Sequence, residues 1–232
     1  LVSKGCVLIK VVSSCISAGT EISGVQGSGK SLIKRALEQP QNVIKVIDMV
    51  RSDGVAAAYA KIKGKVDTES VTGYSLSGVV IAVGDGVSRF HVGDHVAAAG
   101  AGIANHAEYV DVPENLVMKM PRGMGFAEAS TVTLGGIAMQ GVRRADLRLG
   151  EYVVVVGTGI LGLLTVQMLK SSGIRVVATD LDNSRLEIAK ELGAEIILNP
   201  DSDDIISMVE SWTGGYGADA VIFTRATSSS EA

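Results

Sequence analysis

A glycine-rich turn between an expected strand and an expected helix constrains this chain more than any other feature. Residues 153–156 are four consecutive valines, a pattern typical of a parallel strand that is buried on both faces. The turn GTGILG follows directly and places glycine at positions 157, 159 and 162, which matches the pattern G-x-G-x-x-G. Its place after a buried strand predicts a strand–turn–helix unit.

The residues after the turn continue this unit. We expect a helix that ends near Gly173, where a glycine favours a C-terminal cap. The apolar face of that helix is predicted to carry four residues: Leu161, Leu164, Thr165 and Met168. A second strand, expected at 175–179, then leads to Asp180.

Each part of this unit has a physical role in binding a dinucleotide. Gly157 allows the tight turn, Gly159 lets the backbone approach a pyrophosphate, and Gly162 lets the helix pack closely against the strand. The helix N-terminus presents N–H groups and the positive end of its dipole to the phosphates. Asp180 would accept hydrogen bonds from the adenosine ribose. The alternative is a glycine-rich turn in any α/β protein, which the order of strand, glycines, helix, strand and acid disfavours.

The composition excludes several classes of protein. The chain has 232 residues and a net charge of −4, with both signs interspersed, so we expect neither nucleic acid nor an anionic membrane as a partner. Cys6 and Cys15 are too few for a disulfide framework or a cysteine zinc site. No apolar run reaches the roughly 20 residues that span a bilayer. The chain begins at Leu1 and shows no signal peptide, so the expected location is the cytoplasm.

The first half of the chain predicts short strands joined by glycine turns. Strands are expected at 6–17, within 73–98 on both sides of a Gly-Asp-Gly turn, and at 106–112, where Pro113 ends the last one. This pattern suggests a small barrel. Two further segments have helical patterns, 31–39 and 42–63. An alanine-rich, helix-like stretch at 126–145 leads to the dinucleotide-binding unit.

A second phosphate-binding motif lies in this half. GVQGSGKS, from Gly24 to Ser31, matches the P-loop pattern, in which Lys30 would contact the phosphates of ATP or GTP and Ser31 a magnesium ion. Its context differs from that of a P-loop, because the preceding TEIS is not a buried strand and the candidate Walker-B acid, Asp48, lies in a helical pattern. We therefore interpret the segment as a solvated basic loop that enters a helix, with nucleotide hydrolysis as an alternative.

Taken in order, these segments resemble the medium-chain dehydrogenase/reductase family. The resemblance is carried by VLIKVV (7–12), SAGTE (17–21), GYSLSGVVIAVGDGV (73–87), FHVGDHVA (90–97), AEYVDVP (107–113), VVVVGTGILGLLTVQMLK (153–170) and TDLDNSRLEIAKELGAE (179–195). It implies an α/β protein with a GroES-like β-barrel domain at 1–125, which contains a helical insertion at 31–63. A linking helix and a Rossmann dinucleotide-binding domain follow at 126–232.

The family's members are longer at both ends, so the chain resembles an excerpt whose Rossmann domain is incomplete at the C-terminus. The resemblance implies the strand order 3-2-1-4-5-6, of which strands one to four would be present at about 152–156, 175–179, 195–198 and 220–224. The insertion, together with SAGTE and GAGIANHAEYV (100–110), is similar to the dehydrogenase half of bi-domain oxidoreductases and to bacteriochlorophyllide-type dehydrogenases.

The resemblance implies a nicotinamide cofactor. Its contacts would come from the following residues: Gly157, Thr158, Gly159, Ile160, Leu161, Gly162, Asp180, Arg185 and Thr133. Asp180 predicts NAD rather than NADP, because its carboxylate would repel a 2′-phosphate and can accept from a free 2′-hydroxyl. Asp182 adds negative charge nearby, whereas the competing hypothesis is that Arg185 reaches back and binds the phosphate of NADP.

The zinc-dependent branch of the family has ligands at positions that this sequence fills differently. They would align with the following residues: Ala18, Tyr74, Ser75 and Thr133. None of these is a usual zinc ligand, so we expect no catalytic zinc. A side chain must then handle the proton, and the candidates are Tyr74 first and His106 second. His91 and His95 flank a turn and are expected to be solvated.

Two classes of function follow. The first is a zinc-independent, NAD(H)-dependent oxidoreductase that transfers a hydride between nicotinamide and an alcohol or carbonyl substrate, with sugar derivatives among the candidates. Tyr74 and His106 favour it, because the resemblance places their segments along the interdomain cleft. The second is a non-catalytic dinucleotide-binding or regulatory module, which the missing zinc ligands favour. Expected partners are a small-molecule substrate and either a second copy of the chain or a further domain.

Overall fold

The computed structural model describes residues 2–17 and 72–225. The chain divides into two compact units, an N-terminal unit, Leu1–Ser130, and a C-terminal unit, Thr131–Ala232. The helical segments expected at 31–39 and 42–63, and the P-loop-like motif from Gly24 to Ser31, lie outside the described residues. Within the described ranges, no helix has the length and apolar character needed to cross a membrane.

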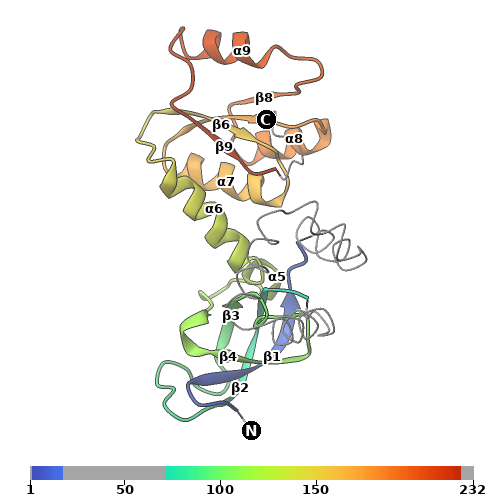
Figure 1. Ribbon diagram of the computed structural model, residues 1–232, viewed down its shortest axis with the longest axis vertical. Helices are drawn as coiled ribbons and strands as arrows, with labels where there is room; N and C mark the ends of the chain where they lie inside the picture. The colour runs from blue at the N-terminus through green and yellow to red at the C-terminus, as the bar shows by residue number, and fades with distance from the viewer. Residues whose placement is uncertain (1, 18–71, 226–232) are drawn as a thin grey trace, which may run out of the picture. The chain divides into compact units, whose positions relative to one another are not determined.

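The N-terminal unit is built on a five-stranded sheet in the order β4-β1-β2-β3-β5 (Figure 1). Its strands are β1 (Cys6–Ser14), β2 (Ser75–Val83), β3 (His95–Ala99), β4 (Tyr109–Pro113) and β5 (Val117–Lys119), with a short 3-10 helix η1 (Glu114–Leu116) before β5. All four strand pairings are antiparallel. Alternate residues of the strands, such as Val7 and Ile9 in β1, are fully buried and form one hydrophobic core. The strands expected from the sequence in this half are confirmed, although β1 ends at Ser14.

The helix-like stretch at 126–145 is two helices, so the expectation of one continuous segment is wrong. The helices are α5 (Phe126–Ala129) and α6 (Val132–Arg144). The Ser75 hydroxyl on β2 donates to the carbonyl of Ser130 at 2.6 Å, and the Ser77 hydroxyl donates to the carbonyl of Phe126 at 2.5 Å. In a continuous helix the Ser130 carbonyl would accept from the next turn. The buried serines of β2 therefore fix α5 as a separate element.

The C-terminal unit contains a four-stranded parallel sheet in the order β8-β7-β6-β9. Its elements are β6 (Tyr152–Val156), α7 (Ile160–Ser171), β7 (Arg175–Thr179), α8 (Asn183–Glu191), β8 (Ile196–Leu198), α9 (Ile205–Trp212) and β9 (Ala220–Phe223). In chain order the strands lie 3-2-1-4, which confirms the order predicted from the sequence. Figure 1 shows α7 and α8 on one side of this sheet and α9 on the other, and a separate hydrophobic cluster lies on each side.

The buried face of α7 differs from the expected one. Its buried residues are Gly162, Thr165, Val166 and Leu169, so only Thr165 belongs to the face predicted from the sequence. The reason is the third glycine of the turn, which must face the strand for the helix to pack closely. That contact sets the rotation of the helix, and residues three, four and seven positions after Gly162 follow it inward. The expected helix end is confirmed, since Gly173 has a φ of 74°.

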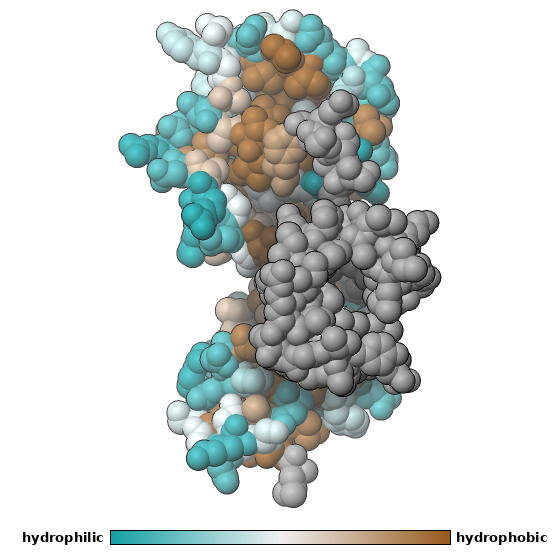
Figure 2. All heavy atoms as spheres, viewed as in Figure 1, coloured by the Kyte–Doolittle hydropathy of each residue, from teal (hydrophilic) through white to brown (hydrophobic). Residues whose placement is uncertain are grey.

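The strand β9 presents an exposed apolar edge. Among the described strands it has β6 as its single neighbour. Val221 is 51% exposed and Phe223 is 56% exposed, and Figure 2 shows hydrophobic surface over the positions that β9 and α9 occupy in Figure 1. An edge strand of this kind is a template for pairing with another chain.

We therefore expect residues 1–232, purified alone, to self-associate as their concentration rises. The change Phe223→Lys should reduce this association, because a charged side chain on an edge strand disfavours pairing. Sedimentation velocity over a range of concentrations measures the effect. A matched control is Val92→Lys in the N-terminal unit, where the residue is 65% exposed and lies far from β9 in sequence. A monomer at every concentration, or an equal effect of both changes, would contradict the prediction.

Candidate functional site

The three glycines of the turn differ in their surroundings. Gly157 has a φ of 94°, which a residue with a side chain rarely adopts. A Cβ at Gly162 would overlap the carbonyl oxygen of Gly157 and lie 2.8 Å from the Thr224 hydroxyl oxygen. A Cβ at Gly159 would meet no atom within 4 Å. Gly157 therefore serves the turn and Gly162 the packing of α7, whereas the space beside Gly159 is open to a ligand.

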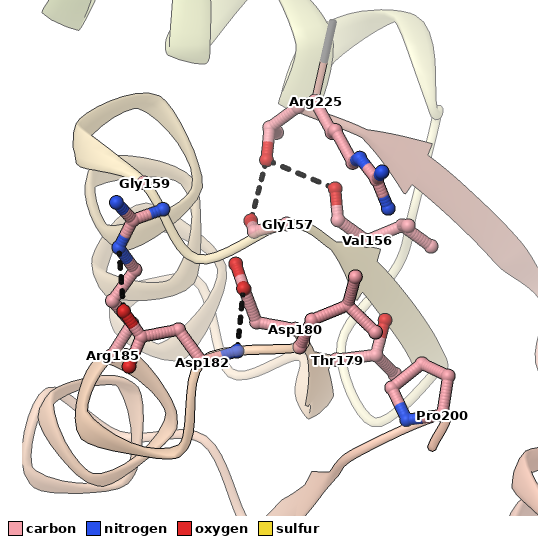
Figure 3. Close-up of a pocket in the computed structure, with 11 residues that line it drawn as sticks. Val156, Gly157, Gly159, Thr179, Asp180, Asp182, Arg185, Pro200 and Arg225 are labelled. Carbon is pink, nitrogen blue, oxygen red and sulfur yellow. Dashed lines mark hydrogen bonds and ion pairs between the residues drawn. The ribbon is translucent and has the colours of Figure 1, made fainter. Parts of the chain in front are cut away.

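A pocket of about 560 Å³ lies at the carboxyl ends of the parallel strands (Figure 3). Its lining residues are Val156, Gly157, Gly159, Thr179, Asp180, Leu181, Asp182, Arg185, Pro200, Thr224 and Arg225. They lie at or shortly after the carboxyl ends of β6, β7, β8 and β9, and this edge of a parallel sheet is where ligands bind in such folds. Gly157, Gly159, Asp180 and Arg185 from the sequence-predicted set are brought together here.

The carboxylate of Asp180 is held by three donors. The Thr158 backbone N–H donates to Oδ2 at 2.6 Å, the Thr158 hydroxyl donates to the same oxygen at 3.1 Å, and the Asp182 N–H donates to Oδ1 at 3.0 Å. Partial burial alone would raise the pKa of this carboxyl, but these hydrogen bonds and the nearby Arg185 charge lower the pKa below its ordinary value. Asp180 is therefore a fixed negative charge at the pocket.

Thr158 holds this carboxylate with both its backbone and its side chain. Its side chain is fully buried, so it does not line the pocket itself. Because both its N–H and its hydroxyl bind Asp180, the residue between the first two glycines orients the acid at the end of β7. Thr158 therefore contributes to the site indirectly, by holding Asp180 in place.

Asp182, two residues after Asp180, also lines the pocket. It is the N-cap of α8 and accepts from the Ser184 N–H at 2.9 Å. Its other carboxylate oxygen lies 3.4 Å from Nε of Arg185 in an ion pair. The Ser184 hydrogen bonds lower the pKa of the Asp182 carboxyl most, and Arg185 lowers it further. Figure 3 shows the Arg185 side chain lying alongside Asp182.

The start of α7 faces the same region. Gly159 is its N-cap, and no side chain caps this end of the helix. The first N–H groups of a helix have no partner within the helix and favour an anion. The predicted contacts Ile160 and Leu161 lie in this first turn. Thr133 lies in the first turn of α6 and is not among the residues that line the pocket.

Sequence reasoning missed two residues at the end of β9. The Thr224 hydroxyl donates to the carbonyls of Val156 at 3.2 Å and Gly157 at 2.6 Å, and so ties the glycine turn to the neighbouring strand. Arg225 brings a positive charge to the pocket rim. The signal that could have found them is their position directly after the fourth parallel strand, where ligand-binding residues gather.

The two candidate proton donors lie in adjoining segments of the N-terminal unit. The His106 N–H donates to the Thr72 carbonyl at 2.9 Å, and the Gly100 N–H donates to the Tyr74 carbonyl at 2.9 Å. A Cβ at Gly73 would lie 2.6 Å from the His106 nitrogen, so only glycine allows this approach. Nδ1 of His106 lies 2.9 Å from the Ser14 hydroxyl at the end of β1. Both candidate side chains are half-buried.

The positions aligned with zinc ligands do not form a metal site in the described residues. Ser75 is fully buried and its hydroxyl is used to hold α5, and Tyr74 and Thr133 carry hydroxyls that are poor zinc ligands. Residues 2–17 and 72–225 contain no group of three or more His, Cys, Asp or Glu side chains placed to hold a metal. His91 and His95 are exposed, as expected. Ala18 lies outside the described residues.

Two family models match the chain. The model described as alcohol dehydrogenase GroES-like domain matches residues 43–122, and the model described as zinc-binding dehydrogenase matches residues 161–230. The order of the two matches is the order of the two units. The chain belongs to the medium-chain dehydrogenase/reductase family, with a GroES-like domain followed by a Rossmann-type domain.

Several curated relatives are similar to the chain. An alcohol dehydrogenase of Geobacillus stearothermophilus is 29% identical over 226 residues, which cover 83% of this chain and 67% of the relative. The (R,R)-butanediol dehydrogenase of Bacillus subtilis is 31% identical over 175 residues (64% and 50%). The D-guloside 3-dehydrogenase of Escherichia coli is 35% identical over 154 residues (66% and 43%). The matched parts span between about two fifths and two thirds of these relatives.

Solved structures share the fold. The crystal structure of 2R,3R-butanediol dehydrogenase from Bacillus subtilis has a TM-score of 0.61 and 30% identity, and the match covers 67% of this chain and 52% of that one. An alcohol dehydrogenase superfamily protein from Novosphingobium aromaticivorans has a TM-score of 0.68 and 25% identity (97% and 59%). A mycobacterial protein solved with NADPH has a TM-score of 0.65 and 24% identity, a likeness of fold alone.

Proposed function

We propose that this chain is the part of an NAD(H)-dependent oxidoreductase that binds the adenosine end of the cofactor and carries groups for transfer of a proton. The observation that carries the proposal is the Asp180 carboxylate, held by Thr158 and Asp182 at the edge of a pocket beside the glycine turn. An acid in this place accepts hydrogen bonds from the hydroxyls of a ribose. The relatives named above, an alcohol dehydrogenase, a butanediol dehydrogenase and a D-guloside 3-dehydrogenase, support the reaction class.

The negative charge of Asp180 supports NAD over NADP. The hydrogen bonds to Asp180 keep its carboxylate ionised at neutral pH, so it would repel a 2′-phosphate. A free 2′-hydroxyl instead offers it a donor. Arg185 is the group that would accommodate a 2′-phosphate, and it is paired with Asp182.

The proposed chemistry uses a side chain for the proton and no zinc. The bound nicotinamide would supply or accept the hydride. Tyr74 can donate a hydrogen bond from its hydroxyl to the substrate oxygen, which stabilises a developing alkoxide. His106 can donate or accept a proton through its ring nitrogens, and the hydrogen bond between its Nδ1 and Ser14 orients the ring. The substrate class is an alcohol or the corresponding carbonyl compound, sugar derivatives included.

Titrating NAD and NADP into the intact protein by calorimetry tests the cofactor assignment. We expect NAD to bind more tightly by about tenfold or more, because a like charge placed against the 2′-phosphate opposes binding. Metal analysis of the same preparation should find no stoichiometric zinc, and a chelator should leave turnover unchanged. Tighter binding of NADP, or loss of activity on chelation that zinc restores, would contradict the proposal.

The second candidate is a dinucleotide-binding module without catalysis. The observation that favours it is the structural use of Ser75, which stands at a zinc-ligand position and instead holds α5. Such a module would bind NAD yet show no cofactor reduction with a panel of alcohols and sugars. Turnover with any member of the panel would decide for the enzyme.

A further inference from the structure

The adenosine end of the pocket holds two carboxylates and one guanidinium. Asp180 and Asp182 are joined by the hydrogen bond from the Asp182 N–H to Oδ1 of Asp180, so the two acids have a fixed relative position. Arg185 lies in the first turn of α8 and pairs with Asp182 through Nε at 3.4 Å. The ion pair leaves both side chains about half exposed, at 55% for Arg185 and 47% for Asp182. Arg185 is therefore close enough to contact a ligand in the pocket, but it is already paired with the carboxylate of Asp182.

Asp182 is itself constrained by a second role. Its Oδ1 accepts from the Ser184 N–H at 2.9 Å and from the Ser184 hydroxyl at 2.6 Å, which caps α8. The cap fixes Oδ1, so the remaining oxygen, Oδ2, is directed to Arg185. The acid therefore stays beside the arginine as part of the helix start.

We propose that Asp182 determines cofactor specificity by occupying Arg185, so that this guanidinium is not available to a 2′-phosphate. The inference rests on the proposed function, because it concerns the choice between NAD and NADP at the same pocket. Asp180 opposes the phosphate directly, whereas Asp182 acts mainly through the arginine. A phosphate must displace Asp182 from Arg185 and also tolerate its charge.

The change Asp182→Asn separates the two roles of this residue. Asparagine is as good an N-cap as aspartate, so α8 keeps its start, while the ion pair and one negative charge are lost. Exposed ion pairs are individually weak, so we expect the ratio of NADP affinity to NAD affinity to rise by about three- to tenfold rather than to invert. The gain should shrink in high salt, since it comes from exposed charges.

A cycle of variants in the intact protein tests the inference. NAD and NADP affinities are measured by calorimetry for the unaltered protein, Asp182→Asn, Arg185→Gln and the double variant. Asp182→Asn should raise the ratio of NADP affinity to NAD affinity in the unaltered protein. The same change should leave that ratio unchanged when it is made in Arg185→Gln. Arg225→Gln is the matched control: this arginine also lines the pocket but lies next to Gly157, so its loss should weaken both cofactors alike.

The outcomes separate this inference from the proposed function. Preference for NADP in the unaltered protein would contradict the proposed function. A preference for NAD, with the ratio unchanged in Asp182→Asn, would leave the function intact and overturn the inference. A gain that persists without Arg185 would also overturn it, because repulsion by Asp182 alone would then explain the specificity.

Discussion

The change Gly162→Ala should destabilise the C-terminal unit strongly, whereas Gly159→Ala should leave its stability nearly unchanged and remove most of its affinity for a dinucleotide. At position 162 an added Cβ would overlap the backbone carbonyl of Gly157 and press on Thr224. Overpacking of this kind costs about 1–3 kcal/mol, and more when the neighbour is backbone. Alanine gains about 1 kcal/mol over glycine inside a helix, so the net effect remains destabilising by about 2 kcal/mol.

At position 159 the same change meets open space. Gly159 has a φ of −68°, which alanine adopts without strain, and no atom lies within 4 Å of the added Cβ. Alanine is a poorer N-cap than glycine by less than about 1 kcal/mol, and its smaller unfolded-state entropy offsets a similar amount. The added methyl group would nevertheless occupy the space through which the backbone approaches a pyrophosphate, so we expect affinity for NAD to fall at least about tenfold.

Urea unfolding and calorimetric titration with NAD measure the two effects on the same variants. The pair serves as its own control, since both changes are Gly→Ala within one turn. Equal stability of the two variants would contradict the packing role of Gly162. Unchanged affinity in Gly159→Ala would show that the cofactor does not approach this turn.

The sequence predicted the parallel strands because strong local signals coincide there, whereas the order of the strands followed from the resemblance to the family. Four valines, three glycines and an acid each indicate the same unit, and the fourth strand follows from its apolar run. The buried face of α7 could not be obtained in the same way, since leucines occur on several sides of this helix. The close approach of Gly162 to the carbonyl of Gly157 within the same turn selects the face.

At the site, the sequence predicted the residues that lie near the glycine turn along the chain and missed those brought in by strand pairing. Asp180 and Arg185 follow the turn along the chain, and pattern reasoning found both. Thr224 and Arg225 reach the pocket through the pairing of β9 with β6, which local sequence does not reveal. The break at Ser130 was missed for a similar reason, because it depends on a hydroxyl from Ser75 in a distant strand.

Replacing the true proton donor should reduce kcat by about 10²- to 10⁴-fold without changing the affinity for NAD, as is typical of general acid–base catalysis. Tyr74→Phe removes only a hydroxyl from a half-buried ring, so the fold should persist. His106→Asn removes the proton exchange but keeps an amide group near Nδ1, and so preserves a partner for Ser14. Steady-state turnover on the identified substrate, together with NAD titration, measures both effects.

The dependence of kcat on pH distinguishes the two candidates. If His106 is the donor, the dependence of kcat on pH should contain a titration that His106→Asn abolishes and Tyr74→Phe retains. The matched control is His95→Asn, since His95 is an exposed histidine on β3, and its turnover should be normal. Normal turnover in both Tyr74→Phe and His106→Asn would show that the proton is handled elsewhere. A cofactor that binds to all variants with no turnover in any, the unaltered protein included, would instead favour the non-catalytic module, because binding at Asp180 does not depend on either side chain.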